Sequence, residues 1–75
     1  MGEFKYEIVK NLATLSEGNN GWTKEINIIS WNGREPKLDL RDWNHEEGKM
    51  GKGITLTDDE ALNLLNALMK KYDIK

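Results

Sequence analysis

The chain has 75 residues, carries 11 Lys and Arg against 13 Asp and Glu for a net charge of −2, and contains no cysteine. This length predicts a single domain over residues 1–75 that buries only roughly 60% of its unfolded surface, so a core shared in a homodimer is a natural source of stability. The absence of cysteine excludes disulfides and thiolate metal sites. With no apolar run of about 18 residues and no signal-peptide pattern, we expect a cytoplasmic protein without a membrane span.

The first two expected elements are strands joined by a hairpin. Residues 4–15 begin with alternating apolar and polar side chains, which predicts a half-buried strand with Phe4 and Tyr6 in the core. Residues 16–21 are a cluster of turn formers that ends in Asn-Gly, a pair that adopts positive φ readily. This cluster predicts a hairpin into a second strand over residues 22–31.

Alternation along the second strand predicts its two faces. Ile26 and Ile28 fall on one face, and Ile29 and Trp31 fall on the other. Two adjacent isoleucines mean either that both faces are covered or that a bulge intervenes. A second Asn-Gly turn follows, and Pro36, the only proline, lacks an amide donor and marks the start or edge of a third strand.

The third strand is expected over residues 37–43. Leu38 and Leu40 share the face that we expect to form the core. The opposite face, expected to be a binding surface, carries Lys37, Asp39, Arg41 and Trp43. Residues 44–53 are polar and rich in glycine, which predicts an exposed loop, and a short fourth strand is expected over residues 54–56.

A helix is expected to begin at Asp58. Thr57 and Glu60 have the spacing of a capping box, in which each side chain bonds the other residue's amide. An apolar stripe at helical spacing is formed by Ala61, Leu64, Leu65, Leu68, Met69 and Tyr72. We expect this stripe to pack on the Leu38 and Leu40 face and to meet a symmetry mate. The fold class is therefore α+β, with four antiparallel strands followed by one C-terminal helix.

Enzyme chemistry finds no support in the residues. Residues 52–56 lack the Walker pattern, and His45 is the lone histidine, too few ligands for a metal site. Asp39 and Asp42 are three residues apart on a strand, which places them on opposite faces and excludes an acid/base pair. Asp39 is expected to orient Arg41 or Lys37. We therefore expect a non-enzyme without catalytic residues, metal or cofactor.

Four ordered motifs carry a family resemblance. They are Trp31-Asn32-Gly33, Leu38-Asp39-Leu40-Arg41-Asp42-Trp43, Gly48-Lys49-Met50 and Lys52-Gly53-Ile54-Thr55-Leu56. In these motifs the chain resembles the transcriptional coactivator p15/PC4 family, especially its short bacterial, YdbC-like members, which bind single-stranded DNA. The resemblance implies a curved sheet, a homodimer formed partly through the helix, and single-stranded DNA held on the concave face with little sequence preference.

The expected binding residues divide by their chemistry. Tryptophan rings stack on bases and cations follow phosphates, so Trp beside Arg and Lys suits single-stranded nucleic acid. The expected contacts are Trp31 and Trp43 to bases, Lys37 and Arg41 to backbone or base edges, and Lys24, Lys49 and Lys52 to phosphates. Trp22 is expected at the edge of the binding groove, although its parity matches the expected core residues Ile26 and Ile28.

Other readings of the same residues stay open. The two tryptophans could instead close a small second core or a dimer seam, and residue types alone do not separate these readings. The negative net charge favours a protein-interaction (coactivator) module, and a single-stranded RNA binder would use the same stacking surface. Family analogy implies a role in transcription regulation or in replication and repair.

Overall fold

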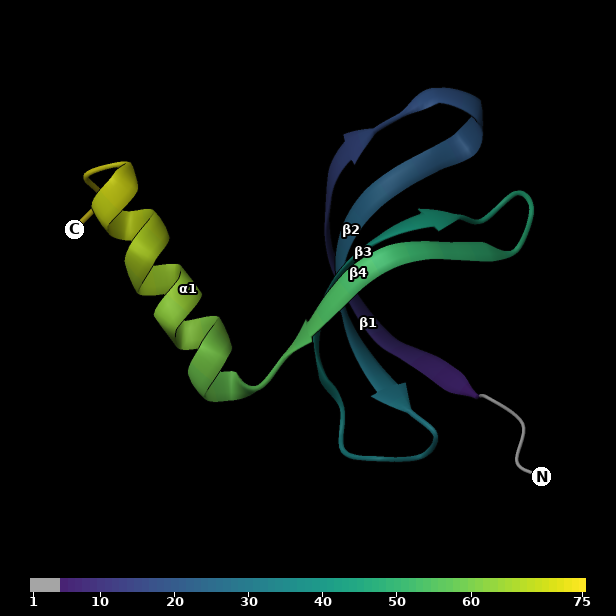
Figure 1. Cartoon of the computed structure of the whole chain (residues 1–75), viewed down its shortest axis with the longest axis horizontal. Coiled ribbons are helices and arrows are strands. Elements are labelled where there is room, and N and C mark those ends of the chain that lie inside the picture. The colour runs from purple at the N-terminus through teal and green to yellow at the C-terminus, as the bar shows by residue number, and fades with distance from the viewer. Residues whose placement is uncertain (1–4) are drawn as a thin grey trace.

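The structure, a computed structural model, describes residues 5–75, so the expected core position of Phe4 lies outside the described residues. Four antiparallel strands form one sheet in chain order, and a single helix follows (Figure 1). The elements are β1 (Tyr6–Glu17), β2 (Trp22–Trp31), β3 (Lys37–Asn44), β4 (Lys49–Leu56) and α1 (Asp58–Lys71). The predicted ββββα fold is confirmed.

The two Asn-Gly pairs make the turns that the sequence predicts. Asn20 and Gly21 have φ of 63° and 85°, and they end the short 3₁₀ turn η1 (Asn19–Gly21) that leads into β2. Asn32 and Gly33 have φ of 52° and 75° directly after β2. These left-handed conformations cost little for Asn and Gly, which is why the local sequence locates both turns correctly.

The β3–β4 hairpin differs from the prediction. The predicted loop over residues 44–53 shrinks to a turn at residues 45–48, because β4 already begins at Lys49. Asn44 pairs with Lys49, and Trp43 pairs with Met50. A register shift follows, so that Arg41 pairs with Gly53. Backbone pairing does not need apolar side chains, so a polar, glycine-rich segment can form an outer strand.

Three register shifts interrupt the pairing of β1 with β2. They fall between Ile8 and Lys10, between Asn11 and Ala13, and between Thr14 and Ser16. Each shift leaves one extra residue on β1, and these residues are Val9, Leu12 and Leu15, all largely exposed. Bulges bend a strand and increase its twist, so they contribute to the curvature of the sheet.

The buried centre of the sheet lies on the concave face, which contradicts the expectation that the Leu38 and Leu40 face forms the core. Ile29 is fully buried and Trp43 is 2% exposed, whereas Leu38 and Leu40 are only half-buried. Pairing of β2 with β3 is regular, so parity along these strands is correct. The prediction is wrong only about which of the two faces of the sheet is buried.

The helix does not cover the opposite face as expected. α1 has the predicted capping box, with Thr57 Oγ1 accepting from the Glu60 amide at 3.2 Å and the Thr57 amide donating to Glu60 Oε1 at 2.9 Å. It contains no buried residue, and it projects away from the sheet (Figure 1). Only Thr57 separates β4 from α1, which leaves too little chain for the helix to fold back. Its apolar stripe, including the half-exposed Leu65, is therefore uncovered.

Candidate nucleic-acid interface

Four aromatic rings follow one another on the concave face. Trp31 of β2 lies 5.8 Å from Tyr6 of β1, and Tyr6 lies 5.5 Å from Trp43 of β3, measured between ring centroids. Trp43 in turn stacks on His45 at 5.8 Å with an angle of 4° between the ring planes. We call Trp31, Tyr6, Trp43 and His45 the aromatic row. All three distances lie in the range at which aromatic pairs attract each other.

Arg41 closes the Trp31 end of the row. Its guanidinium carbon lies 5.1 Å from the centre of the Trp31 ring, within the range of a cation–π contact. Nε and one terminal nitrogen of Arg41 each donate to Asp39 at 3.0 Å, and the other terminal nitrogen donates to the Gly51 carbonyl at 3.1 Å. Asp39 is fully buried and also accepts from the Thr55 hydroxyl at 2.9 Å. The predicted orientation of Arg41 by Asp39 is confirmed.

Gly53 makes room for Arg41 on the neighbouring strand. A Cβ at this position would lie 2.5 Å from the Arg41 Cβ and 2.6 Å from the Leu40 carbonyl oxygen. Neither neighbour is the free end of a flexible side chain, so any larger residue would push β3 and β4 apart. The glycine therefore sets the close approach that holds Arg41 beside Trp31.

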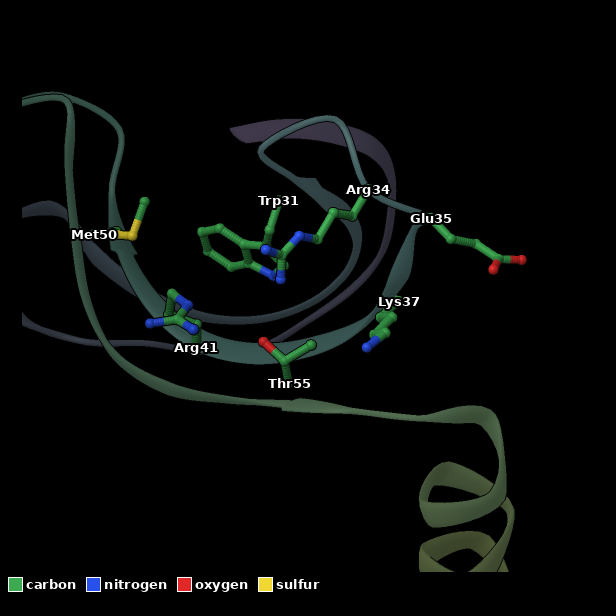
Figure 2. Close-up of a pocket in the computed structure, with 7 residues that line it drawn as sticks. All are labelled: Trp31, Arg34, Glu35, Lys37, Arg41, Met50 and Thr55. Atoms are coloured by element: carbon green, nitrogen blue, oxygen red, sulfur yellow. The ribbon is translucent and has the colours of Figure 1, made fainter. Parts of the chain in front are cut away.

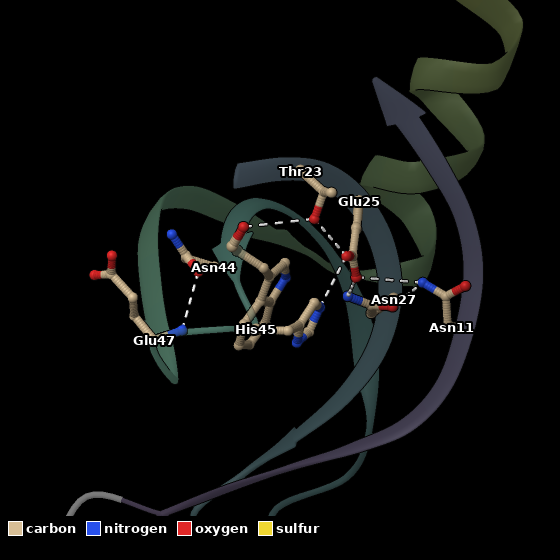
Figure 3. A network of polar contacts seen from close by, with 8 residues as sticks. Asn11, Thr23, Glu25, Asn27, Asn44, His45 and Glu47 are labelled. Atoms are coloured by element: carbon tan, nitrogen blue, oxygen red, sulfur yellow. Dashed lines mark hydrogen bonds and ion pairs between the residues drawn. The ribbon is translucent and has the colours of Figure 1, made fainter. Parts of the chain in front are cut away.

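Glu25 contacts His45, which forms the other end of the aromatic row. Its buried carboxylate accepts from the Thr23 hydroxyl at 2.6 Å, from the Asn27 amide at 3.2 Å and from the Asn11 amide at 3.4 Å, and it contacts His45 Nε2 at 2.9 Å (Figure 3). Burial raises the pKa of Glu25, but the hydrogen bonds from Thr23, His45 and Asn27, together with the charge of His45, outweigh it and hold that pKa below 4.5. Glu25 therefore stays ionised at neutral pH.

A pocket of about 390 Å³ opens beside Trp31 in the hollow of the sheet (Figure 2). It is lined by Trp31, Arg34, Glu35, Lys37, Arg41, Met50 and Thr55. Figure 2 shows the Trp31 ring above Arg41 and Thr55, while the Glu35 carboxylate points away from the pocket. Arg41 is held in its ion pair with Asp39, whereas Arg34 and Lys37 are exposed at this pocket. The pocket thus offers an aromatic ring, a fixed planar cation and two exposed cations.

The predicted binding residues are only partly brought together. Trp31, Lys37 and Arg41 line the pocket, and Lys52 is exposed on β4 without an ion pair among residues 5–75. Trp43 shares the face of Trp31, Lys37 and Arg41 but is buried among other rings, so a base reaches it only if a neighbouring ring moves.

Three other predicted residues lie elsewhere. Trp22 and Lys24 lie on the opposite face of β2, by the alternation that puts Glu25 on the concave face. There Lys24 forms an exposed ion pair with Asp42 at 3.1 Å, which also confirms that Asp42 and Asp39 face opposite ways. Lys49 pairs with Glu47 at 3.2 Å in the β3–β4 turn.

Several site residues escaped the sequence reasoning. Glu25 could have been found, because it shares the parity of Ile29 and Trp31 on β2. Tyr6 was predicted as core but is an exposed-edge member of the aromatic row. His45 was predicted as a solvated loop residue, and no periodicity could place it, because it lies in a turn where alternation ends.

The fold and the concave face define a small ββββα protein whose aromatic and basic side chains gather on one side of an open curved sheet. Comparison with known families gives a match between residues 18–67 and the transcriptional coactivator p15 (PC4) family. This chain belongs to that family.

A relative from Treponema pallidum (strain Nichols), named only as an uncharacterized protein, is 48% identical over 66 residues. The match covers 88% of this chain and 78% of the relative. Within residues 5–75, no helix is long and apolar enough to cross a membrane.

Proposed function

We propose that this protein binds single-stranded DNA along the concave face of its sheet, with little sequence preference. The observation that carries the proposal is the aromatic row with the pocket at its Trp31 end. Every base has a π-face, so stacking on rings tolerates any sequence. Membership of the coactivator family supports a nucleic-acid-binding or coactivator-like role.

The pocket residues would divide the work of binding. Trp31 stacks on a base, and Arg41, held flat by Asp39, presents its remaining N–H donors to a base edge. Lys37 and Arg34, which pair with no acid among the described residues, follow the phosphates. Trp43 supports the row from within the protein, a role that its burial favours over direct contact.

A homodimer is part of this proposal. The face of Leu38 and Leu40 is half-exposed, and the apolar stripe of α1 is uncovered in a single chain. Monomeric proteins rarely leave contiguous apolar patches of this kind in water. A second copy would cover both surfaces and leave the concave face free. The protein would act as a cytoplasmic, non-enzymatic binder in transcription regulation or in replication and repair.

The test is a titration with oligo-dT, oligo-U and duplex DNA at two salt concentrations. We expect clear preference for single strands, because bases in a duplex are already stacked on both faces. Trp31→Ala should weaken binding, whereas Trp22→Ala, a matched change on the opposite face, should not. Equal affinity for duplex and single strand would refute the proposal, and oligo-U binding more tightly than oligo-dT would make the protein an RNA binder. No binding to any of the three would leave the protein-interaction module as the function.

A further inference from the structure

We infer that His45 is a further base-stacking residue, forming the solvent-facing end of the aromatic row. This inference rests on the proposed function, because it adds a second stacking position to the same concave face. The two positions would lie at opposite ends of the row, with the Trp31 pocket at one end and His45 at the other. A bound strand would then run along the row.

The orientation of the ring is the first argument. The His45 imidazole is parallel to the Trp43 indole within 4°, with 5.8 Å between the ring centroids, so the two rings form an offset parallel pair. The side chain of His45 is nevertheless 56% exposed, whereas Trp43 is only 2% exposed. His45 therefore extends the buried indole towards solvent and offers a flat surface that Trp43 itself cannot offer.

The way in which the ring is held is the second argument. His45 Nε2 lies 2.9 Å from Glu25 Oε2, and Glu25 is fixed by the Thr23 hydroxyl at 2.6 Å and by the amides of Asn27 and Asn11. Burying a carboxylate is unfavourable unless hydrogen bonds satisfy it, so the folded protein must keep this network. It fixes an exposed turn residue in one orientation, and a ring held in advance loses less side-chain entropy when a base stacks on it.

The symmetry of the two ends is the third argument. Each end of the row carries a planar nitrogen-containing group, Arg41 at one end and His45 at the other. Each of these groups is anchored by a buried carboxylate on the concave face, from Asp39 and Glu25 respectively. The pocket at the Arg41 end already has the features of a base site. The same construction at the other end favours the same use.

The experiment compares two substitutions that separate stacking from support. His45→Phe keeps a ring but cannot bond Glu25, and His45→Gln places an amide nitrogen where Nε2 contacts Glu25 but has no ring. We expect His45→Phe to lose only about threefold in oligo-dT affinity, because its ring still stacks although Glu25 no longer holds it. His45→Gln should lose roughly tenfold, the effect of one base–aromatic stack. The loss should appear only with oligonucleotides long enough to extend from the pocket to the turn. Trp31→Ala, in contrast, should weaken binding at every length.

A second measurement uses the parent protein. His45 is the only histidine, so its imidazole C–H proton signals are unambiguous in a nuclear magnetic resonance spectrum. They should move on addition of oligo-dA, whose bases have strong ring currents. Unmoved signals in a protein that binds would overturn the inference. Equal affinity of His45→Gln and the parent, or a loss in His45→Phe as large as in His45→Gln, would also overturn it. If the parent binds no single strand at all, the proposed function itself fails.

Discussion

Asp39→Asn is the substitution that tests most directly how the concave face is built. The Asp39 carboxylate is fully buried and accepts three hydrogen bonds, two from Arg41 at 3.0 Å and one from Thr55 at 2.9 Å. The amide keeps the shape but loses the charge and turns an N–H group towards a donor. Breaking a buried ion pair by changing one partner costs about 3–5 kcal/mol. Because Arg41 is 15% exposed and keeps its bond to Gly51, we expect the lower end, about 3 kcal/mol.

Urea denaturation at one fixed protein concentration measures this loss. The matched control is Asp42→Asn, three residues along the same strand, whose carboxylate forms an exposed pair with Lys24. Exposed pairs contribute about 0–1 kcal/mol, so the control should unfold nearly as the parent does. A difference of under about 1 kcal/mol between the two variants would refute the view that Asp39 and Arg41 form a buried structural pair.

The other predictions concern burial, ionisation and association. Trp43→Ala should lower the unfolding free energy, measured in urea, by about 3–5 kcal/mol, as expected for a buried Trp. Trp31→Ala should keep the fold and lose about 1–3 kcal/mol of oligo-dT affinity. If Trp31→Ala instead unfolds and Trp43→Ala loses only affinity, Trp31 is the core residue and Trp43 the stacking residue. The pKa of Glu25 is lowered on folding, so its stabilisation is complete above pH 4.5 and is lost as the pH falls through the folded pKa. Thermal unfolding should show this loss below pH 4.5, and Glu25→Gln should reduce it; parallel curves for the two proteins would contradict the assignment. The parent should sediment at twice its 8.7 kDa chain mass, and Leu65→Asp should lower that mass while the adjacent Asn66→Asp should not.

Local sequence signals predicted much of the fold. The Asn-Gly turns and the capping box at Thr57 depend on residues that are close in the chain, and the structure confirms them. Alternation along β2 also placed Ile29 and Trp31 on one face correctly. Such signals report which residues share a face. They do not report which face is covered, because that depends on the whole sheet and on any partner chain.

In the candidate site, too, the sequence showed which residues share a face but not which of them are buried. Asp39 alternates with Leu38 and Leu40, so the sequence placed it on an open surface, but the curvature of the sheet and the neighbouring Arg41 bury it completely. The pairing with Arg41 was expected, but the residue pattern gives no sign that the sheet buries this pair. Trp43 was likewise identified as a site residue on parity, although parity could not show the rings packed around it.

The bulges of β1 also determine how copies of this protein can meet. A regular outer strand presents a row of free N–H and C=O groups that can recruit another strand and start a growing fibre. β1 breaks this row at Val9, Leu12 and Leu15, and β4, the other outer strand, is broken by its own register shift and carries Lys49 and Lys52. Both edges are therefore poor templates for the addition of another strand. In the homodimer that we propose, contacts would therefore lie on the faces of the sheet and on the helix, where a two-fold arrangement closes on itself and growth stops.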